Sequence, residues 1–185
     1  MNTPPGIALA LLALAPPSVA AERRPALVPW PAEIVFGAGE LAVGPDFRVA
    51  VAGRPDPRVQ SAARRLESRL IRQVGLPPPV GAGKVGLEIV CEGGARSALP
   101  ALGIDESYTL EVTAEKAVLR APEPWGVLRG METFLQLVGP GREGFGVPAV
   151  VIRDRPRFPW RGLLIDSGTS CPSRSWSGTS TPWPR

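Results

Sequence analysis

The sequence predicts an α+β fold in which two helices cover one face of a mostly antiparallel sheet. Short apolar runs, typical of strands, are separated by turns, as expected for a 185-residue chain with 21 Gly and 23 Pro. Two longer segments instead repeat their apolar residues at helical spacing, and each is apolar on one side only. Each helix must bury that side, and a single sheet is the simplest surface that buries both.

The expected strands follow the apolar runs in chain order. Glycines separate the first three runs, and a turn at 113–116 joins two alternating runs into a hairpin candidate. The strand candidates are 32–36, 41–43, 47–52, 85–90, 108–112, 117–120 and 147–152.

The clearer helix is predicted over 56–74. Asp56 can accept backbone N–H bonds as the N-cap, and Pro57 fits the first helical position, where no N–H is needed. Gly75 follows as the residue that ends the helix. Arginines fill one side, which we expect to be a solvated face. The apolar stripe is Val59, Ala62, Ala63, Leu66, Leu70, Ile71 and Val74.

The second helix is predicted over 124–138, with Gly139 and Pro140 ending it. Gly130 lies inside it and costs about 1 kcal/mol against Ala, so we expect this glycine to allow a close approach to the sheet. The apolar stripe is Trp125, Leu128, Met131, Phe134, Leu135 and Val138.

The composition excludes several kinds of site. The chain has no histidine, which removes Ser-His-Asp and Cys-His catalysis and histidine-based metal sites, so we expect no metal and no cofactor. The net charge of +4 does not predict a nucleic-acid surface. Beyond residue 20, the sequence has no apolar segment long enough to predict a membrane span. Cys91 lies in a strand-like run and is expected to be a small core residue.

Residues 1–20 resemble an export signal. Ile7–Ala15 is an apolar core too short to span a bilayer, and Ser18–Ala20 supplies small residues of the kind that precede a signal-peptide cleavage site. No Lys or Arg precedes the core, which leaves a misassigned start codon as the alternative. We expect export to the periplasm or outside the cell, with a mature chain that begins near Ala21.

The segment Arg153–Asp166 predicts the entry to a second domain. It starts polar and interrupted by proline and then becomes the apolar run Gly162–Ile165, typical of a strand covered on both faces, as in a parallel barrel. Asp166 stands at the end of that strand where barrel enzymes place substrate-facing residues. Residues 167–185 are too few for a barrel, which needs roughly 200 residues or more.

Four blocks of sequence, taken in order, resemble the family 20 glycoside hydrolases, the β-N-acetylhexosaminidases. The resemblance implies a non-catalytic N-terminal domain over 21–152, with the fold sometimes called zincin-like, and a linker and first barrel strand over 153–166. In a whole enzyme this domain would pack on the barrel. The blocks are ESYTLEV at 106–112, AVLRA at 117–121, WGVLRGMETFLQL at 125–137 and IRDRPRFPWRGLLID at 152–166.

The resemblance also implies an activity and where its residues would lie. These enzymes remove terminal N-acetylhexosamine from glycans, using the substrate's own acetamido oxygen and an adjacent Asp-Glu pair deep in the barrel. We therefore expect no catalytic residue in this chain and no activity on its own. Asp105 and Glu106 form an Asp-Glu pair too, but they precede a strand of the small domain and are expected to be a solvated turn.

The family has an Arg-His-aromatic motif after the aspartate that matches Asp166, whereas this chain has Gly168–Cys171 there. Reading GC-rich codons for 167–185 one base out of register restores Arg-His, followed by a pattern typical of an amphipathic helix. We therefore expect a frameshift near Ser167, which would make 167–185 an out-of-frame, disordered tail. An intact reading frame at the locus, with no barrel-coding sequence downstream, would refute this.

A second function remains open at this point, a small secreted module that binds a glycan or a protein. Trp30, Trp125 and Trp160 could stack on sugar rings. The plainer interpretation is that Trp125 belongs to the core and that the other two pack between domains. Titration with chitooligosaccharides separates the two functions, because a fragment of a hexosaminidase is expected to give no heat.

Overall fold

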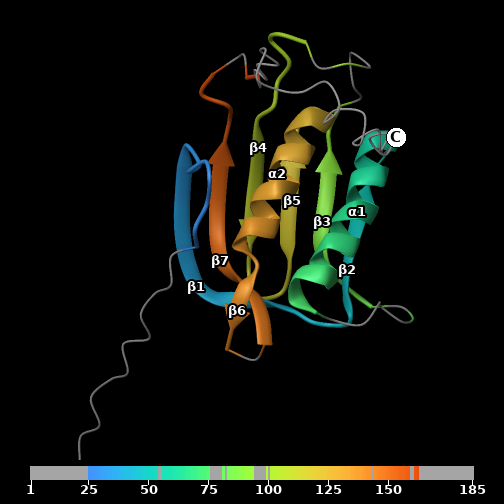
Figure 1. Cartoon of the computed structure of the whole chain (residues 1–185), viewed down its shortest axis with the longest axis vertical. Helices are drawn as coiled ribbons and strands as arrows, with labels where there is room; N and C mark the ends of the chain where they lie inside the picture. Colours follow the sequence, from blue (N-terminus) through green and yellow to red (C-terminus); the bar gives the residue numbers. More distant parts are fainter. Residues whose placement is uncertain are drawn as a thin grey trace, which may run out of the picture.

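The computed structural model of the protein describes residues 25–53, 56–75, 81, 83–93, 99, 101–142, 144–158 and 161–162. Within these ranges the chain forms one seven-stranded sheet and two helices (Figure 1). In chain order the elements are β1 (Glu33–Val43), β2 (Phe47–Ala52), α1 (Pro57–Val74), β3 (Lys84–Cys91), β4 (Tyr108–Val112), β5 (Ala117–Ala121), α2 (Pro124–Leu137), β6 (Gly139–Gly141) and β7 (Gly144–Asp154).

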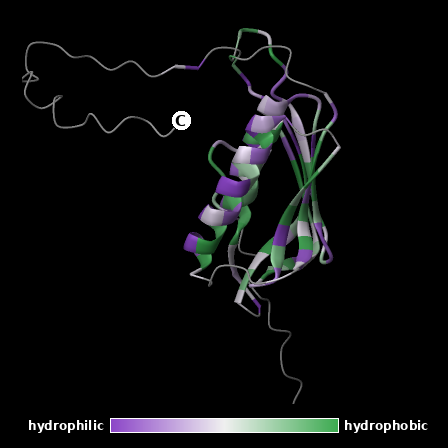
Figure 2. Ribbon diagram, turned by 90° about the vertical axis from the view of Figure 1, so that its right-hand side faces the viewer, coloured by the Kyte–Doolittle hydropathy of each residue, from purple (hydrophilic) through white to green (hydrophobic). Residues whose placement is uncertain are grey.

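The sheet is mixed but mostly antiparallel. Its strand order is β1-β7-β4-β5-β3-β2, with the short β6 paired to β7 outside this path. The pairs β1–β7, β7–β4, β4–β5 and β6–β7 are antiparallel, whereas β5–β3 and β3–β2 are parallel. Both helices lie on the same side of the sheet, which is clear when the sheet is viewed from its edge (Figure 2). The predicted fold class is confirmed.

The first two predicted strands are one strand. β1 runs through the glycines that were expected to form a turn, and its register with β7 shifts between Phe36 and Glu40. Gly39 has a φ of 96°, a conformation that glycine adopts without the strain that a Cβ would bring. The glycines therefore form an irregularity of the β-bulge type, which re-aims the strand without ending it.

Helix α1 begins and ends where its capping residues predict. The Oδ1 atom of Asp56 accepts a hydrogen bond from the backbone N–H of Arg58 at 2.8 Å, and Gly75 has the left-handed φ of 66°. The helix packs beside β2, at one edge of the sheet. There Glu67 Oε1 accepts a hydrogen bond from the N–H of Val49 at 3.0 Å. This bond satisfies a backbone donor on an edge strand, so that donor is not available for pairing with a strand of another chain.

Helix α2 lies over β4 and β5 (Figure 1). It ends at Leu137, one residue earlier than predicted, and Gly139 and Pro140 do more than end it. They form β6, in which Gly139 pairs with Gly146 of β7. The chain therefore passes from the helix layer into the sheet with no intervening loop.

The predicted close approach at Gly130 is confirmed. A Cβ on this residue would lie 2.2 Å from Cδ1 of Leu119, a fully buried side chain of β5. Nearby, the buried rings of Phe134 and Phe47 stack with their centroids 6.0 Å apart. The core is thus centred between α2 and the middle of the sheet, and this packing holds α2 as a fixed platform.

Three predicted features lie outside the described residues. They are the export signal at 1–20, the apolar run Leu163–Ile165 with Asp166, and the out-of-frame tail at 167–185. No helix in the described part of the chain is long and apolar enough to cross a membrane.

Candidate functional site: a polar junction where the chain leaves the sheet

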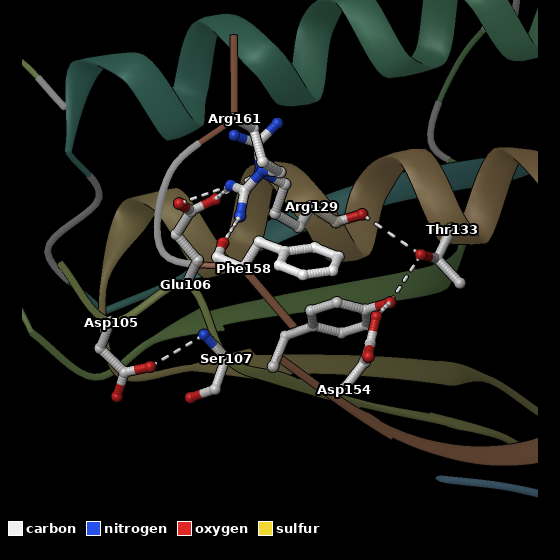
Figure 3. Close-up of polar contacts among 9 residues, drawn as sticks. Asp105, Glu106, Ser107, Arg129, Thr133, Asp154, Phe158 and Arg161 are labelled. Carbon is white, nitrogen blue, oxygen red and sulfur yellow. Dashed lines mark hydrogen bonds and ion pairs between the residues drawn. The ribbon is translucent and has the colours of Figure 1, made fainter. Parts of the chain in front are cut away.

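Polar side chains from four segments meet where the chain leaves β7 (Figure 3). They come from the loop before β4, from β4 itself, from α2 and from the residues around the end of β7. We call this group the exit junction, and we call residues 155–158 and 161–162 the exit segment. The members of the junction are Glu106, Tyr108, Arg129, Thr133, Asp154 and Arg161.

Glu106 joins two arginines that are far apart in the sequence. Its Oε2 atom lies 2.6 Å from Nε of Arg129, on α2, and both of its carboxylate oxygens lie 2.6 Å from Nη2 of Arg161, in the exit segment. Only 19% of the Glu106 side chain is exposed. Burial works to raise the pKa of Glu106, but the hydrogen bonds from Arg161 and Arg129 outweigh it and hold this pKa below its usual value.

Asp105 and Glu106 have different roles, although they are neighbours. Asp105 is exposed, and its Oδ1 atom accepts a hydrogen bond from the backbone N–H of Ser107 at 2.8 Å. The hydrogen bonds from Ser107 lower the pKa of Asp105. The expected solvated turn therefore describes Asp105 but not Glu106, which is mostly covered. No short-range pattern marks this difference, because both arginines reach Glu106 through the fold.

Tyr108 is the buried centre of the junction. Its hydroxyl donates to Oδ2 of Asp154 at 3.1 Å and lies 2.6 Å from Oγ1 of Thr133. The other oxygen of Asp154 accepts a hydrogen bond from the N–H of Ala32 at 3.0 Å. Burial, and then the charge of Asp154, raise the pKa of Tyr108 well above its usual value, so the phenol keeps its proton. These bonds tie β4, α2 and β7 to the segment that enters the sheet.

Two hollows flank the junction. The smaller, of about 230 Å³, lies between the loop before β4 and the exit segment. The larger, of about 510 Å³, opens beside β7, β4 and β5. No cluster of three or more His, Cys, Asp or Glu side chains that could hold a metal ion occurs among the described residues. The charged residues that line the larger hollow carry both signs: Glu33, Glu92, Glu111, Arg120, Asp154, Arg153 and Arg155.

Two of the three tryptophans proposed for sugar stacking lie in the described structure. Trp30 is 45% exposed, in the segment before β1. Trp125 is half-buried rather than a full core residue, and the guanidinium carbon of Arg58 lies 5.1 Å from the centroid of its ring system. Trp160 lies outside the described residues. Cys91 is likewise half-buried and packs against the core, where burial raises the pKa of its thiol.

The two-layer fold and the junction define a small α+β domain whose last strand is tied down where the chain leaves it. Residues 24–155 match the profile described as "Glycosyl hydrolase family 20, domain 2". The chain belongs to this family, of which it carries domain 2. In full enzymes of the family, domain 2 packs against the catalytic barrel. The match is to domain 2 alone and ends at residue 155.

Individual relatives agree with this assignment. The chain is 46% identical over 84 residues to the beta subunit of beta-hexosaminidase from Rattus norvegicus, and 51% identical over 71 residues to that of Homo sapiens. These alignments cover 45% and 38% of this chain but only 15% and 13% of the relatives. Among solved structures, the chitobiase of Flavobacterium johnsoniae is 34% identical with a TM-score of 0.65, over 75% of this chain and 22% of that one.

Proposed function

We propose that this chain is the N-terminal, non-catalytic domain of an exported β-N-acetylhexosaminidase, and that it supports the catalytic barrel of such an enzyme. The observation that carries the proposal is the match to domain 2 over residues 24–155. The relatives with the same domain are named beta-hexosaminidases and a chitobiase. The parent enzyme would remove terminal N-acetylhexosamine from glycans, with its reacting groups in the barrel.

The structure supports a scaffolding role in two ways. Helix α2 is buried on most of its surface, and the polar side chains Arg129, Glu132 and Gln136 on its outer side each bond to a different segment. Arg129 bonds to Glu106, Glu132 pairs with Arg69 of α1, and Gln136 accepts a hydrogen bond from the N–H of Val28. A platform tied to its surroundings in this way suits the support of a neighbouring domain.

A domain exchange tests this function. Residues 24–162 of this chain would replace the matching domain of the Flavobacterium johnsoniae chitobiase, and hydrolysis of an aryl N-acetylglucosaminide would be measured. We expect the chimera to be soluble and active, because the two domains share a fold at 34% identity. The same enzyme with the domain deleted is the control and should lose soluble activity. A chimera no better than this control would count against the proposal.

Glycan binding by the domain itself is the second candidate. The partial exposure of Trp30 is the observation that favours it, because an accessible indole can stack on a sugar. Isothermal titration against chitooligosaccharides decides between the two. The scaffolding function expects no heat. Saturable heat that is lost in Trp30→Ala, with the fold intact, would support glycan binding instead.

We also propose that the protein is exported. The support is the sequence of residues 1–20 alone, with its apolar core at Ile7–Ala15 and the small residues at Ser18–Ala20. N-terminal sequencing of the protein from its native cells is the test. A chain that begins near Ala21 would agree with export, and a mature chain that still begins at Met1 would contradict it.

A further inference from the structure

The segment that leaves the sheet is tied back onto the helix layer by a single carboxylate. We propose that Glu106 is a positioning residue, whose bonds to Arg129 and Arg161 fix the direction in which the chain leaves the domain. We call Glu106, Arg129 and Arg161 the clasp. All three residues belong to the described domain and exit segment. The consequence of the clasp for the placement of a barrel rests on the function proposed above.

One side of the clasp is rigid. Arg129 projects from α2, and the helix is held by eight buried residues along its inner side. Gly126 and Gly130 of this helix approach the sheet so closely that a Cβ would lie 2.1 Å from the carbonyl oxygen of Ser107 or 2.2 Å from Leu119. Glu106 directly precedes Ser107, so the carboxylate and Arg129 are carried by backbones that are packed together.

The other side of the clasp holds the exit segment in two places at once. Arg161 bonds Glu106 through Nη2, and its Nη1 donates to the backbone carbonyl of Phe158 at 2.9 Å. One guanidinium therefore links the backbone carbonyl of Phe158 to the carboxylate of Glu106. Arg129 and Arg161 converge on the same carboxylate in Figure 3.

The clasp depends on charge. Charge-assisted hydrogen bonds are stronger than neutral ones, and a partly covered carboxylate is screened less than an exposed one. Without the negative charge of Glu106, the guanidinium groups of Arg129 and Arg161 would face each other. Arg155 lines the smaller hollow together with Arg161. The neighbouring carboxylate of Asp105 bonds to Ser107, so it does not replace Glu106.

A second point of attachment lies earlier in the chain, and together with the clasp it restricts the direction of the exit segment. Asp154, the last residue of β7, is bonded to Tyr108 and to the N–H of Ala32. The chain between Asp154 and Arg161 is therefore fixed to the domain at both ends, which limits the paths open to it. A segment held only at Asp154 would be free to point in many directions.

Local opening of the exit segment in the full 185-residue chain is the test. In Glu106→Gln we expect the amide hydrogens of residues 157, 158, 161 and 162 to exchange about tenfold faster, as the loss of charge-assisted bonds implies. Trypsin should also cut the Arg157–Phe158 bond faster, whereas the Arg155–Pro156 bond resists it. Glu132→Gln is the matched control, because Glu132 lies on the same helix as Arg129 but pairs with Arg69 of α1 and not with the exit segment. This control should stay within about twofold of the parent in both measurements.

Two further variants separate positioning from a general loss of stability. Arg161→Gln removes only the exit side of the clasp and should give the same faster exchange, while Arg161→Lys should restore part of the protection. The double variant Glu106→Gln/Arg161→Gln should open no faster than either single variant. Unchanged exchange in both Glu106→Gln and Arg161→Gln would overturn the proposal, and so would equal acceleration in Glu132→Gln. None of these readouts needs a barrel, so a failed domain exchange would not contradict the proposed role of Glu106.

Discussion

The hydroxyl of Tyr108 donates a hydrogen bond to Asp154 across 3.1 Å, inside the helix-covered face of the sheet. The same hydroxyl lies 2.6 Å from Oγ1 of Thr133 on α2. Tyr108 begins β4 and Asp154 ends β7, so one phenol joins two neighbouring strands of the sheet to the helix above them. The bond places a charged carboxylate at the point where the chain leaves the fold, and the phenol satisfies it there.

Removing the phenol oxygen should destabilise the domain. In Tyr108→Phe, Asp154 loses its buried donor and Thr133 loses a partner, for which we expect a loss of about 1–3 kcal/mol in the free energy of unfolding. Urea unfolding followed by tryptophan fluorescence measures this. Thr133→Ser keeps the hydroxyl and is the milder control. A Tyr108→Phe variant as stable as the parent would mean that the bond contributes nothing.

The raised pKa of Tyr108 predicts a loss of stability at alkaline pH. The folded state keeps the phenol protonated, whereas the unfolded chain releases the proton near the ordinary value of 10.0. The unfolded state therefore gains in relative stability as the pH rises above about 10. The chain has a single tyrosine, so phenolate absorbance at 295 nm reports this residue alone. A titration with a midpoint near 10 in the folded protein would contradict the buried bond.

Gly130→Ala should destabilise the protein, although alanine is the better helix former. The new Cβ would lie 2.2 Å from Leu119 and 3.0 Å from Tyr108. Overpacking of this kind costs about 1–3 kcal/mol, which exceeds or cancels the helix-propensity gain of about 1 kcal/mol. Thermal unfolding compares this variant with Gln60→Ala, at an exposed position of α1. A Gly130→Ala protein more stable than the parent would show that α2 has room to move away.

The N-cap of α1 offers a pair of variants that separates hydrogen bonding from charge. Asp56→Ala removes the acceptor for the N–H of Arg58 and should cost about 1 kcal/mol. Asp56→Asn keeps an equally good cap and should cost less. Hydrogen bonds from Arg58 lower the pKa of Asp56, so the charged pair stabilises the fold above the unfolded pKa near 3.8. This contribution is lost as the pH falls through the lower, folded pKa. Equal losses in the two variants at neutral pH would assign the whole effect to charge.

Sequence reasoning succeeded where structure depends on neighbouring residues. The bounds of α1 follow from Asp56, Pro57 and Gly75, all of which act on their own helix end. It failed at β1, because a glycine that opens a turn and a glycine that forms a bulge look the same until the partner strand is known. Whether the chain bulges or turns there is decided by pairing with β7, more than 100 residues away in the sequence.

The contacts of the exit junction could not be predicted from the sequence for the same reason. Glu106 bonds to residues 23 and 55 positions away, and no spacing rule connects them. The alternation of β4 predicts the side of the strand on which Tyr108 lies, but the link from Tyr108 to Asp154 spans 46 positions. The blocks at 106–112 and 125–137 contain four members of the junction, yet their sequence indicates a family and not the contacts among them.

The most direct test of the proposed function is the activity of the purified chain alone. Hydrolysis of an aryl N-acetyl-β-glucosaminide would be followed at high protein concentration against a buffer blank and a heat-treated sample. If the chain is a supporting domain whose reacting groups belong to a separate barrel, the rate will equal the blank. Turnover above the blank that is abolished by heating would contradict it, because the domain would then contain a reaction centre of its own.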